Sequence, residues 1–532
     1  FMKQKKFSPD TVFESNTTYV ADRETYHIFP NQTDIRCWWT TVSSSEDALC
    51  AAFVLRNLEN VVIDLGGARL VFHGRVMPFA IYDCKNVTVK NFSIDYDRPF
   101  FTQGRVIQYE PESITIEIPE EFVYRVSDGY FTAVSDTWEH CLNHGNLLFC
   151  AFSHQTGQIS PHAACELGLI GKEIFPNENP PMPIRHITVE EVGEQKVKLS
   201  GFSEKFAPEV GDILVFTHED RRKCGFLLER SCDTNFKNIR LLHVPGLGVI
   251  ANLCHNLTFR RFDVSLDSEN GERAVSINAD ALHGFHCTGK IAVEDCCFEG
   301  LLDDAFNFHG NYITCLEKLD AHKILLHNDG AGLQDMEFFL PGDRVSVLAG
   351  HTSEVRNAYT VKTSELLGNN DLILEVEEDI LEALPGDLIE NLRMPEILIR
   401  GCSVKKARGG IRLSSGKKTL MEQCRLEHSY ILFTGDTNYW FENTGARDAV
   451  IRRNELIHTR IAAFPEFQPT ENAPYYHKNI RIEENIFRQS GKYPVEMNYV
   501  EGFTFLHNTD GNGHAILEKD IKIAASAELV IE

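Results

Sequence analysis

Three aspartates, Asp280, Asp303 and Asp304, stand at a spacing that could bring their carboxylates together. Asp280 ends an Asn-Ala-Asp triplet, and Asp304 follows it by 24 residues. If the chain winds as a coil of about that period, Asp280 and Asp304 occupy equivalent places on neighbouring rungs, roughly 4.8 Å apart. Crowded carboxylates raise at least one carboxyl pKa, and a raised pKa is what a general acid needs near neutral pH.

The adjacent pair Asp303–Asp304 sets a condition on the backbone. Neighbouring residues on a straight strand point to opposite faces, so the two side chains share a site only if the chain bends there. The alternatives are a solvated turn and a calcium site built from carboxylates and carbonyls. The sequence has no calcium-binding loop of spaced Asp, Asn and Gly residues, so we expect neither a metal nor a cofactor.

Short repeated segments predict the elements that position these aspartates. Each is an alternating apolar strand that ends in Cys or Asn, and Asn tolerates the left-handed backbone of a tight corner. Strand, corner and strand at intervals of roughly 20 to 30 residues predict an all-β fold, a right-handed parallel β-helix. A β-sandwich is the alternative, but it has no reason to repeat Cys or Asn at one corner. The marked residues are Asn91, Cys296, Cys402, Cys424, Asn454, Asn485 and Asn508.

Two stretches interrupt the repeat, and both combine alternating strands with Val-Gly-Asp or Pro-Gly-Asp turns. We therefore predict two inserted small β-barrel-like domains. The expected organisation is an N-terminal cap with the first coils (1–101), the first insertion (102–217), coils with the three aspartates (218–311), the second insertion (312–391) and C-terminal coils (392–532).

Bulk composition excludes several classes of protein. Hydrophobic residues make up 43% of the chain and charged residues 24%, as in soluble globular proteins. The net charge of −25 argues against nucleic acid as a partner, because phosphate binding needs a basic surface. No apolar run has the length of a membrane span.

The cysteine content and the first residues of the sequence indicate in which cellular compartment the protein is expected. Fifteen cysteines is an odd number, and their spacing fits neither a small disulfide framework nor a zinc site. The opening FMKQKKFSPDTVF has no apolar core of signal-peptide length. We expect reduced, buried cysteines, which favours the cytoplasm, with a processed secreted or periplasmic chain as the alternative.

Two further residues are expected beside the aspartates. Arg412 lies in the strand predicted one regular rung after Asp304, so it could hold a sugar hydroxyl or orient a carboxylate; a surface salt bridge is the alternative. His309 follows the Asp pair closely, which suggests a supporting role, and a core histidine is its alternative.

Candidate contacts to a ligand lie in two polar stretches. Trp440, in the run GDTNYWFENTG, offers a flat face for a sugar ring, and Asp436 and Glu442 flank it as hydroxyl acceptors. Asp97 and Arg98 form a charged cluster ahead of the first insertion, and we expect them to line the same groove.

These motifs resemble two families of glycoside hydrolases. The order Asn-Ala-Asp, Asp-Asp, His-Gly is similar to the Asn-Thr-Asp, Asp-Asp, Gly-His-Gly site of the polygalacturonases. The nearer resemblance is to glycoside hydrolase family 110, the α-1,3-galactosidases. Its matching stretches are IDYDRPFFTQG (94–104), VPGLGVIANLC (244–254), the segment around Asp280, LLDDAFNFHG (301–310) and GDTNYWFENTG (435–445).

The resemblance implies an inverting exo-glycosidase that releases terminal α-1,3-linked galactose without a metal. Carried over by position, Asp303 is the general acid, and Asp280 and Asp304 together hold the water as base. Inversion leads us to expect the acid at the longer separation from the base.

Two other functions compete with this hypothesis. A polysaccharide lyase or epimerase on the same coil needs a basic residue beside a uronate, whereas this site is acidic. A carbohydrate-binding adhesin needs aromatic and polar contacts but no packed carboxylates. The expected partner is a carbohydrate with a terminal α-galactoside, and the sequence leaves a homodimer open.

Overall fold

The computed structural model describes residues 2–30, 35–36, 49–142, 147–170, 184–218, 223–266, 273–330, 336–350, 352, 354–437, 439–443, 445–465, 474–488 and 493–531. Within these ranges the chain forms strands and one short 3-10 helix, η2 (Glu518–Asp520), but no α-helix. Nor does any helix there have the length and hydrophobicity that crossing a bilayer requires.

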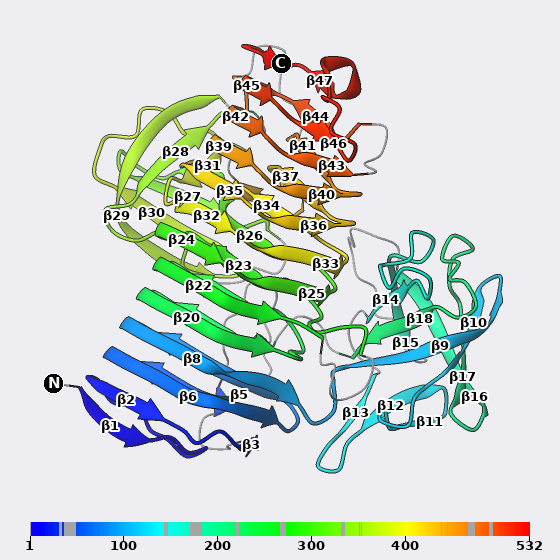
Figure 1. Cartoon of the computed structure of the whole chain (residues 1–532). Helices are drawn as coiled ribbons and strands as arrows, with labels where there is room; N and C mark the ends of the chain where they lie inside the picture. The colour runs from blue at the N-terminus through cyan, green and yellow to red at the C-terminus, as the bar shows by residue number, and fades with distance from the viewer. Residues whose placement is uncertain are drawn as a thin grey trace.

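Parallel strands stack rung upon rung from the N-terminal to the C-terminal end (Figure 1). The predicted all-β fold, a parallel β-helix, is confirmed. The first sheet holds the strands β1 (Lys3–Lys6), β2 (Thr17–Val20), β3 (Thr25–Ile28), β6 (Glu59–Phe72), β8 (Lys85–Tyr96), β20 (Cys232–Leu241), β22 (His255–Val264), β24 (Thr288–Glu294), β25 (Cys297–Leu301), β32 (Glu396–Arg400), β33 (Ser403–Ala407), β35 (Thr419–Glu422), β36 (Arg425–Glu427), β39 (Arg447–Arg452), β40 (Glu455–Ile457), β42 (His477–Glu483), β43 (Ile486–Arg488), β45 (Val500–Leu506), β46 (Thr509–Asp510) and β48 (Val530–Ile531).

A second parallel ladder closes each rung and carries the site described below. Its strands are β5 (Leu49–Arg56), β7 (Val76–Tyr82), β19 (Phe226–Glu229), β21 (Val249–Asn252), β23 (Leu282–Phe285), β26 (Phe306–Lys318), β34 (Ile411–Leu413), β37 (Tyr430–Phe433), β41 (Arg460–Ala463), β44 (Val495–Asn498) and β47 (Lys522–Ala524). Two short strands pair antiparallel with this ladder: β4 (Ile35–Arg36) with β5, and β38 (Glu442–Asn443) with β26.

The predicted corner residues form a ladder of their own. The amide N of Cys424 donates to Oδ1 of Asn454 at 2.9 Å, Asn454 donates to Asn485 at 3.0 Å, and Asn485 donates to Asn508 at 3.0 Å. Cys402 begins the series with its amide N 3.4 Å from Sγ of Cys424. Each side chain is buried, so the ladder satisfies backbone donors that the corner takes out of the sheet.

Asn91 has a positive φ of 64°, as its role as a corner former predicts, but at the other marked positions the left-handed backbone lies one residue earlier. Asn454, Asn485 and Asn508 are not among the residues with positive φ; the residue before each corner position is. The Asn side chain acts through its amide, and the preceding residue makes the bend. The bending residues are Asp295, Gly401, Gln423, Arg453, Glu484 and His507.

Aromatic rings stack inside the coil from rung to rung. Phe79 and Phe226 are stacked with centroids 4.9 Å apart, and Phe236 and Phe259 are stacked at 5.1 Å. All four are fully buried. Such pairs contribute about 0.5–1.5 kcal/mol each beyond the burial of their area, so they support the rungs that hold the aspartates.

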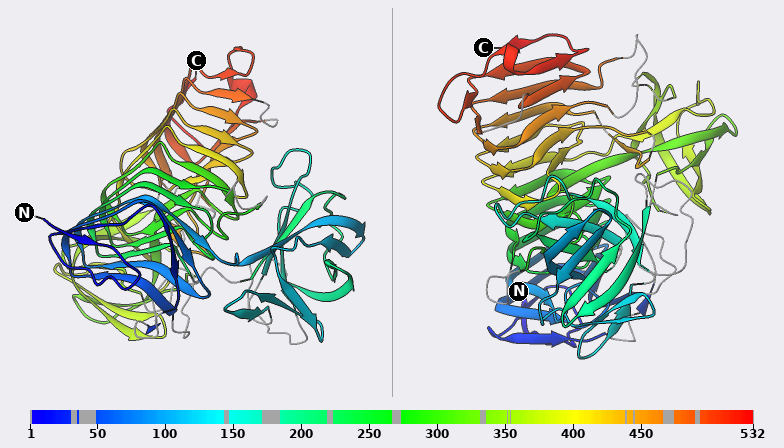
Figure 2. Two further views of the ribbon diagram at one scale, coloured as in Figure 1. Left: turned by 60° about the horizontal axis from the view of Figure 1, so that its bottom comes forward. Right: turned by 90° about the vertical axis from the view of Figure 1, so that its right-hand side faces the viewer.

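The first interruption of the coil is a closed barrel, which lies to one side of the stacked rungs (Figures 1 and 2). It has its own apolar core, centred on Phe101, Phe149 and Phe216. Its strands are β9 (Phe101–Glu110), β10 (Ser113–Glu117), β14 (Leu147–Phe152), β15 (Glu166–Ile170), β16 (Ile184–Gly193), β17 (Lys196–Ser200) and β18 (Ile213–Thr217), and a separate antiparallel sheet holds β11 (Tyr124–Ser127), β12 (Tyr130–Val134) and β13 (Glu139–Cys141).

The second interruption grows out of β26, whose C-terminal half leaves the coil. Antiparallel pairings join β26 to β27 (Lys323–His327), then in turn β30 (Asp371–Val376), β29 (Val355–Gly368), β28 (Arg344–Leu348) and β31 (Leu388–Asn391), which pairs back with β26. The ring therefore closes as a second barrel with a core around Ile313 and Leu374.

Candidate active site

The three aspartates lie in the bends that enter two neighbouring strands of the second ladder. Asp280 precedes β23, and Asp303 and Asp304 precede β26. Ile277 bridges Leu301, and Leu282 pairs with Phe306, so residues 24 apart in the sequence lie side by side. The bend also meets the condition for Asp303 and Asp304 to share a site.

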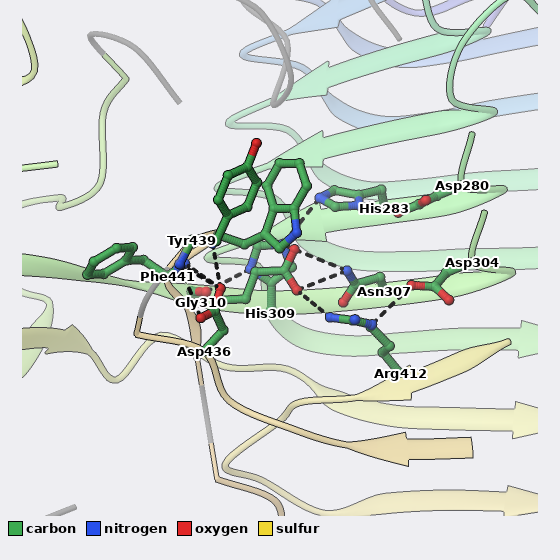
Figure 3. Close-up of polar contacts among 12 residues, drawn as sticks. Asp280, His283, Asp304, Asn307, His309, Gly310, Arg412, Asp436, Tyr439 and Phe441 are labelled. Carbon is green, nitrogen blue, oxygen red and sulfur yellow. Dashed lines mark hydrogen bonds and ion pairs between the residues drawn. The ribbon is translucent and has the colours of Figure 1, made fainter. Parts of the chain in front are cut away.

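Successive side chains along β26 point to opposite faces of the strand. Phe306 and Phe308 face the coil interior, where their rings stack at 4.9 Å. Asn307 and His309 take the opposite face, toward the aspartates (Figure 3). The bulky phenylalanines of this motif therefore belong to the core and do not line the site.

One carboxylate oxygen from each of Asp280, Asp303 and Asp304 lies within 4.8 Å of those of the other two. Asp280 and Asp304 are buried, whereas Asp303 is partly exposed. The distance between the carboxylate of Asp303 and those of Asp280 and Asp304 is thus shorter than the separation that we expected between an acid and its base.

Asp304 is surrounded by donors. Its Oδ1 accepts from Oη of Tyr430 at 2.5 Å and from the amide N of Gly410 at 3.1 Å, and its Oδ2 lies 3.1 Å from Nε of Arg412. A Cβ at the neighbouring Gly409 would come within 2.4 Å of the Asp303 carbonyl carbon, so only glycine permits this close approach.

Burial and the charge of Asp303 raise the pKa of Asp304 to about 7, although Arg412 opposes the rise. Burial, followed by the charges of Asp304 and Asp303, raises the pKa of Tyr430 well above its usual range, so Tyr430 remains a donor. The site can therefore hold one proton near neutral pH. Because interacting carboxyls titrate together, that proton belongs to the cluster rather than to one residue.

Two histidines connect Asp280 to the opposite end of the site. Oδ2 of Asp280 lies 2.5 Å from Nδ1 of His283, and Nε2 of His283 lies 3.2 Å from Nε2 of His309. The Nδ1 of His309 donates to the Gly310 carbonyl at 2.7 Å. Burial lowers the pKa of His309.

Glu442 closes the site from the antiparallel strand β38. Its Oε2 accepts from Nη1 of Arg412 at 3.1 Å, its carboxylate accepts from Nδ2 of Asn307, and its Oε1 lies 3.6 Å from Nε2 of His309. Burial works to raise its pKa, but His309, Arg412 and His283 together outweigh burial and lower the pKa to about 2. Arg412 therefore bridges two carboxylates, Asp304 and Glu442.

The loop before β38 is organised by Asp436 (Figure 3). Its carboxylate accepts from the backbone amides of Tyr439, Trp440 and Phe441, with 2.5 Å to Trp440. Asp436 is buried, so the structure gives it a structural contact where we expected a hydroxyl acceptor. Tyr439 and Trp440 stay partly exposed and pack edge to face at 4.7 Å.

The two charged residues ahead of the first insertion make different contacts from those we expected. Arg98 is 2% exposed, and its guanidinium donates to the carbonyls of Pro99 and Phe101 and to Thr102. Asp97 accepts from Ser135 and from Nε1 of Trp138. These contacts anchor the linker and the first insertion.

Sequence reasoning missed His283, Tyr430 and Asn307. A signal for Tyr430 was present, because the segment Tyr430–Phe433 aligns rung on rung with Gly410–Leu413 once Ile431 is matched with Ile411. His283 in β23 pairs with Asn307 in β26, so these two residues lie side by side on neighbouring rungs.

By distance alone the three carboxylates could hold a divalent cation. Their contacts fit that poorly. Arg412 already places a positive charge on Asp304, and Tyr430 and His283 occupy further oxygens. The donor set fits a proton-sharing cluster better than a metal site. None of the fourteen cysteines within the described residues is one of the residues described in this site.

Fold and site together define a parallel β-helix protein with a cluster of three carboxylates on one ladder. Searched against protein-family models, the chain matches none. Curated relatives do match it. Alpha-1,3-galactosidase B of Bacteroides thetaiotaomicron is 27% identical over 514 residues, which cover 93% of this chain and 80% of the relative.

Two further relatives extend this finding. Alpha-1,3-galactosidase B of Akkermansia muciniphila is 27% identical over 82% of this chain and 54% of its own length, and alpha-1,3-galactosidase A of Shewanella woodyi is 25% identical over 92% and 77%. The predicted resemblance to the α-1,3-galactosidases is therefore confirmed along most of the chain.

Solved structures superpose on the chain only with low scores. One described as a glycoside hydrolase gives a TM-score of 0.27 at 8% identity, covering 86% of this chain and 92% of that one. The Streptococcus pneumoniae adhesin PfbA gives 0.31 at 8% identity, with 96% and 91% covered. Scores this low carry no argument about activity.

Proposed function

We propose that this protein is an exo-acting, inverting glycoside hydrolase that releases terminal α-1,3-linked galactose from oligosaccharides or glycans. The observation that carries the proposal is the cluster of Asp280, Asp303 and Asp304, in which one proton is held near neutral pH. Proteins similar to the chain over most of its length bear the name α-1,3-galactosidase, which supports the choice of sugar and linkage.

The contacts support the catalytic roles that we propose for the three aspartates. Asp304 is held by Tyr430, Gly410 and Arg412, all of which favour a carboxylate, so it serves with Asp280 to bind and deprotonate the water. Asp303 is the most exposed of the three and takes the role of general acid toward the leaving oxygen.

The ligand-binding part of the proposal rests on four side chains. Trp440, with Tyr439, supplies an aromatic surface for the apolar face of a sugar ring. Arg412 and Glu442 form a fixed donor–acceptor pair for sugar hydroxyls.

Galactose release from a panel of substrates tests the proposal directly. We expect hydrolysis of an α-1,3-linked galactose disaccharide and of 4-nitrophenyl α-galactoside, and none of the β-linked isomers. Products are followed by chromatography and by mass. An unsaturated uronate product would instead indicate a lyase, and binding without any product would indicate an adhesin; either outcome would overturn the proposal.

The stereochemical course is a separate prediction. Inverting enzymes usually separate their carboxyl groups by about 6.5–9.5 Å and retaining enzymes by about 5–5.5 Å. The short distances here match the retaining class, yet the donors on Asp304 occupy its oxygens and suit it to orient a water rather than to attack the sugar. We therefore expect β-galactose as the first product. Proton NMR of the first turnovers shows which anomer of galactose forms first. Initial α-galactose would mean that one carboxylate of the cluster acts as a nucleophile.

A further inference from the structure

A continuous chain of polar contacts runs from Asp280 through His283 and His309, which Figure 3 labels, to Glu442. The distances are 2.5 Å from Asp280 to His283, 3.2 Å between the histidines, and 3.6 Å from His309 to Glu442. The side chains of His283 and His309 are 9% and 3% exposed, so water does not screen the chain effectively.

The atoms at each contact determine how many protons the chain contains. A carbonyl only accepts, so Nδ1 of His309 carries a hydrogen toward Gly310. The contact between the two Nε2 atoms needs one hydrogen, and the contact between Asp280 and Nδ1 of His283 needs another. Three hydrogens are required, whereas a carboxylate and two neutral imidazoles supply two.

The additional proton has a preferred place. Burial lowers the pKa of His309, which disfavours its imidazolium form. His283 has a carboxylate at 2.5 Å, and the ionised Glu442 lies just beyond His309. The other charged groups around the chain are Asp303 and Asp304 in the cluster and Arg412 beside Glu442. The positive charge is best compensated on His283.

We infer that His283 is a positioning residue: as an imidazolium it keeps Asp280 ionised, so the proton of the carboxylate cluster stays on the Asp303–Asp304 side. Asp280 can then bind water as a base together with Asp304, while Asp303 presents the acid proton. This inference rests on the proposed function for its catalytic meaning, but the protonation state of His283 can be measured without any substrate.

The first experiment replaces His283 by Asn, whose side-chain amide can donate to Asp280 in place of Nδ1 but carries no charge. An opposite charge this close lowers a carboxyl pKa by about 1–3 units. In His283→Asn we expect the acid limb of the kcat/KM profile to move to higher pH by about one unit or more, with KM little changed. His255→Asn, at an exposed histidine bonded to Thr288, is the matched control and should leave the profile in place.

The second measurement is the nitrogen NMR spectrum of histidine-labelled protein, with His283 assigned by its loss in His283→Asn. A doubly protonated ring at neutral pH is expected. A neutral ring, or an acid limb that His283→Asn does not move, would overturn the inference. A charged His283 ring in a protein that hydrolyses no galactoside would instead support the inferred protonation of His283 and overturn the proposed function.

Discussion

Asp303→Asn is expected to lower kcat on an α-1,3-linked galactose disaccharide by about 10²- to 10⁴-fold, the range in which general acid catalysis contributes. The leaving sugar oxygen needs a proton as the bond breaks, and an amide cannot supply it. A 4-nitrophenyl leaving group needs little protonation, so its hydrolysis should be partly spared. Steady-state kinetics on both substrates measures the difference.

A matched control comes from Asp295, an exposed corner residue with positive φ, where Asn fits the backbone equally well. Asp295→Asn should leave both substrates unaffected. Equal losses on the two substrates in Asp303→Asn would show that Asp303 does not act as the acid.

Arg412→Met is expected to have the largest effect on stability. Arg412 joins the buried carboxylates of Asp304 and Glu442, with 3.1 Å to each. Removing one partner of a buried pair leaves an uncompensated charge and costs about 3–5 kcal/mol of the free energy of unfolding. Denaturant unfolding near neutral pH measures the loss, and activity should fall with it.

The pH dependence of that loss has a definite sign. The folded pKa of Glu442, about 2, lies below the unfolded value of about 4.3, so its contribution is present above that unfolded value and disappears as pH falls through the folded one. Asp304 has the opposite shift, with a folded pKa of about 7, and Arg412 limits that rise. The deficit of Arg412→Met should therefore be larger at about pH 8 than at about pH 5.

Arg481 provides the control for Arg412. It pairs with Glu483 at 2.6 Å on an exposed face, with half of its side chain accessible. Arg481→Met should cost no more than about 1 kcal/mol, because solvent screens the pair. A deficit in Arg412→Met that matches this control, or that grows on acidification, would contradict the bridging role.

Local rules in the sequence were sufficient for the fold and for the grouping of the three aspartates. Strand alternation and repeated Cys or Asn corners predict a coil, and an interval of 24 residues then places Asp280 beside Asp304. Both are short-range patterns, because each rung packs mainly on its neighbours. The register Leu282 to Phe306 follows from that period.

The partners of these aspartates were decided by contacts between distant segments. Tyr430 reaches Asp304 from 126 residues away, and Glu442 enters the site because β38 pairs antiparallel with β26 as that strand leaves the coil. No local pattern encodes such a pairing, because it depends on where the second insertion leaves and rejoins the rungs.

Burial also changed what individual polar residues do. Asp436 and Arg98 look like ligand contacts in the sequence, since each stands among polar neighbours. In the folded chain their charges satisfy backbone amides and carbonyls that would otherwise be left unpaired. The sequence by itself determined the coil and the three carboxylates on it. Only the tertiary structure decided which donors surround them, because a side chain's partners depend on which backbone groups folding leaves without a bond.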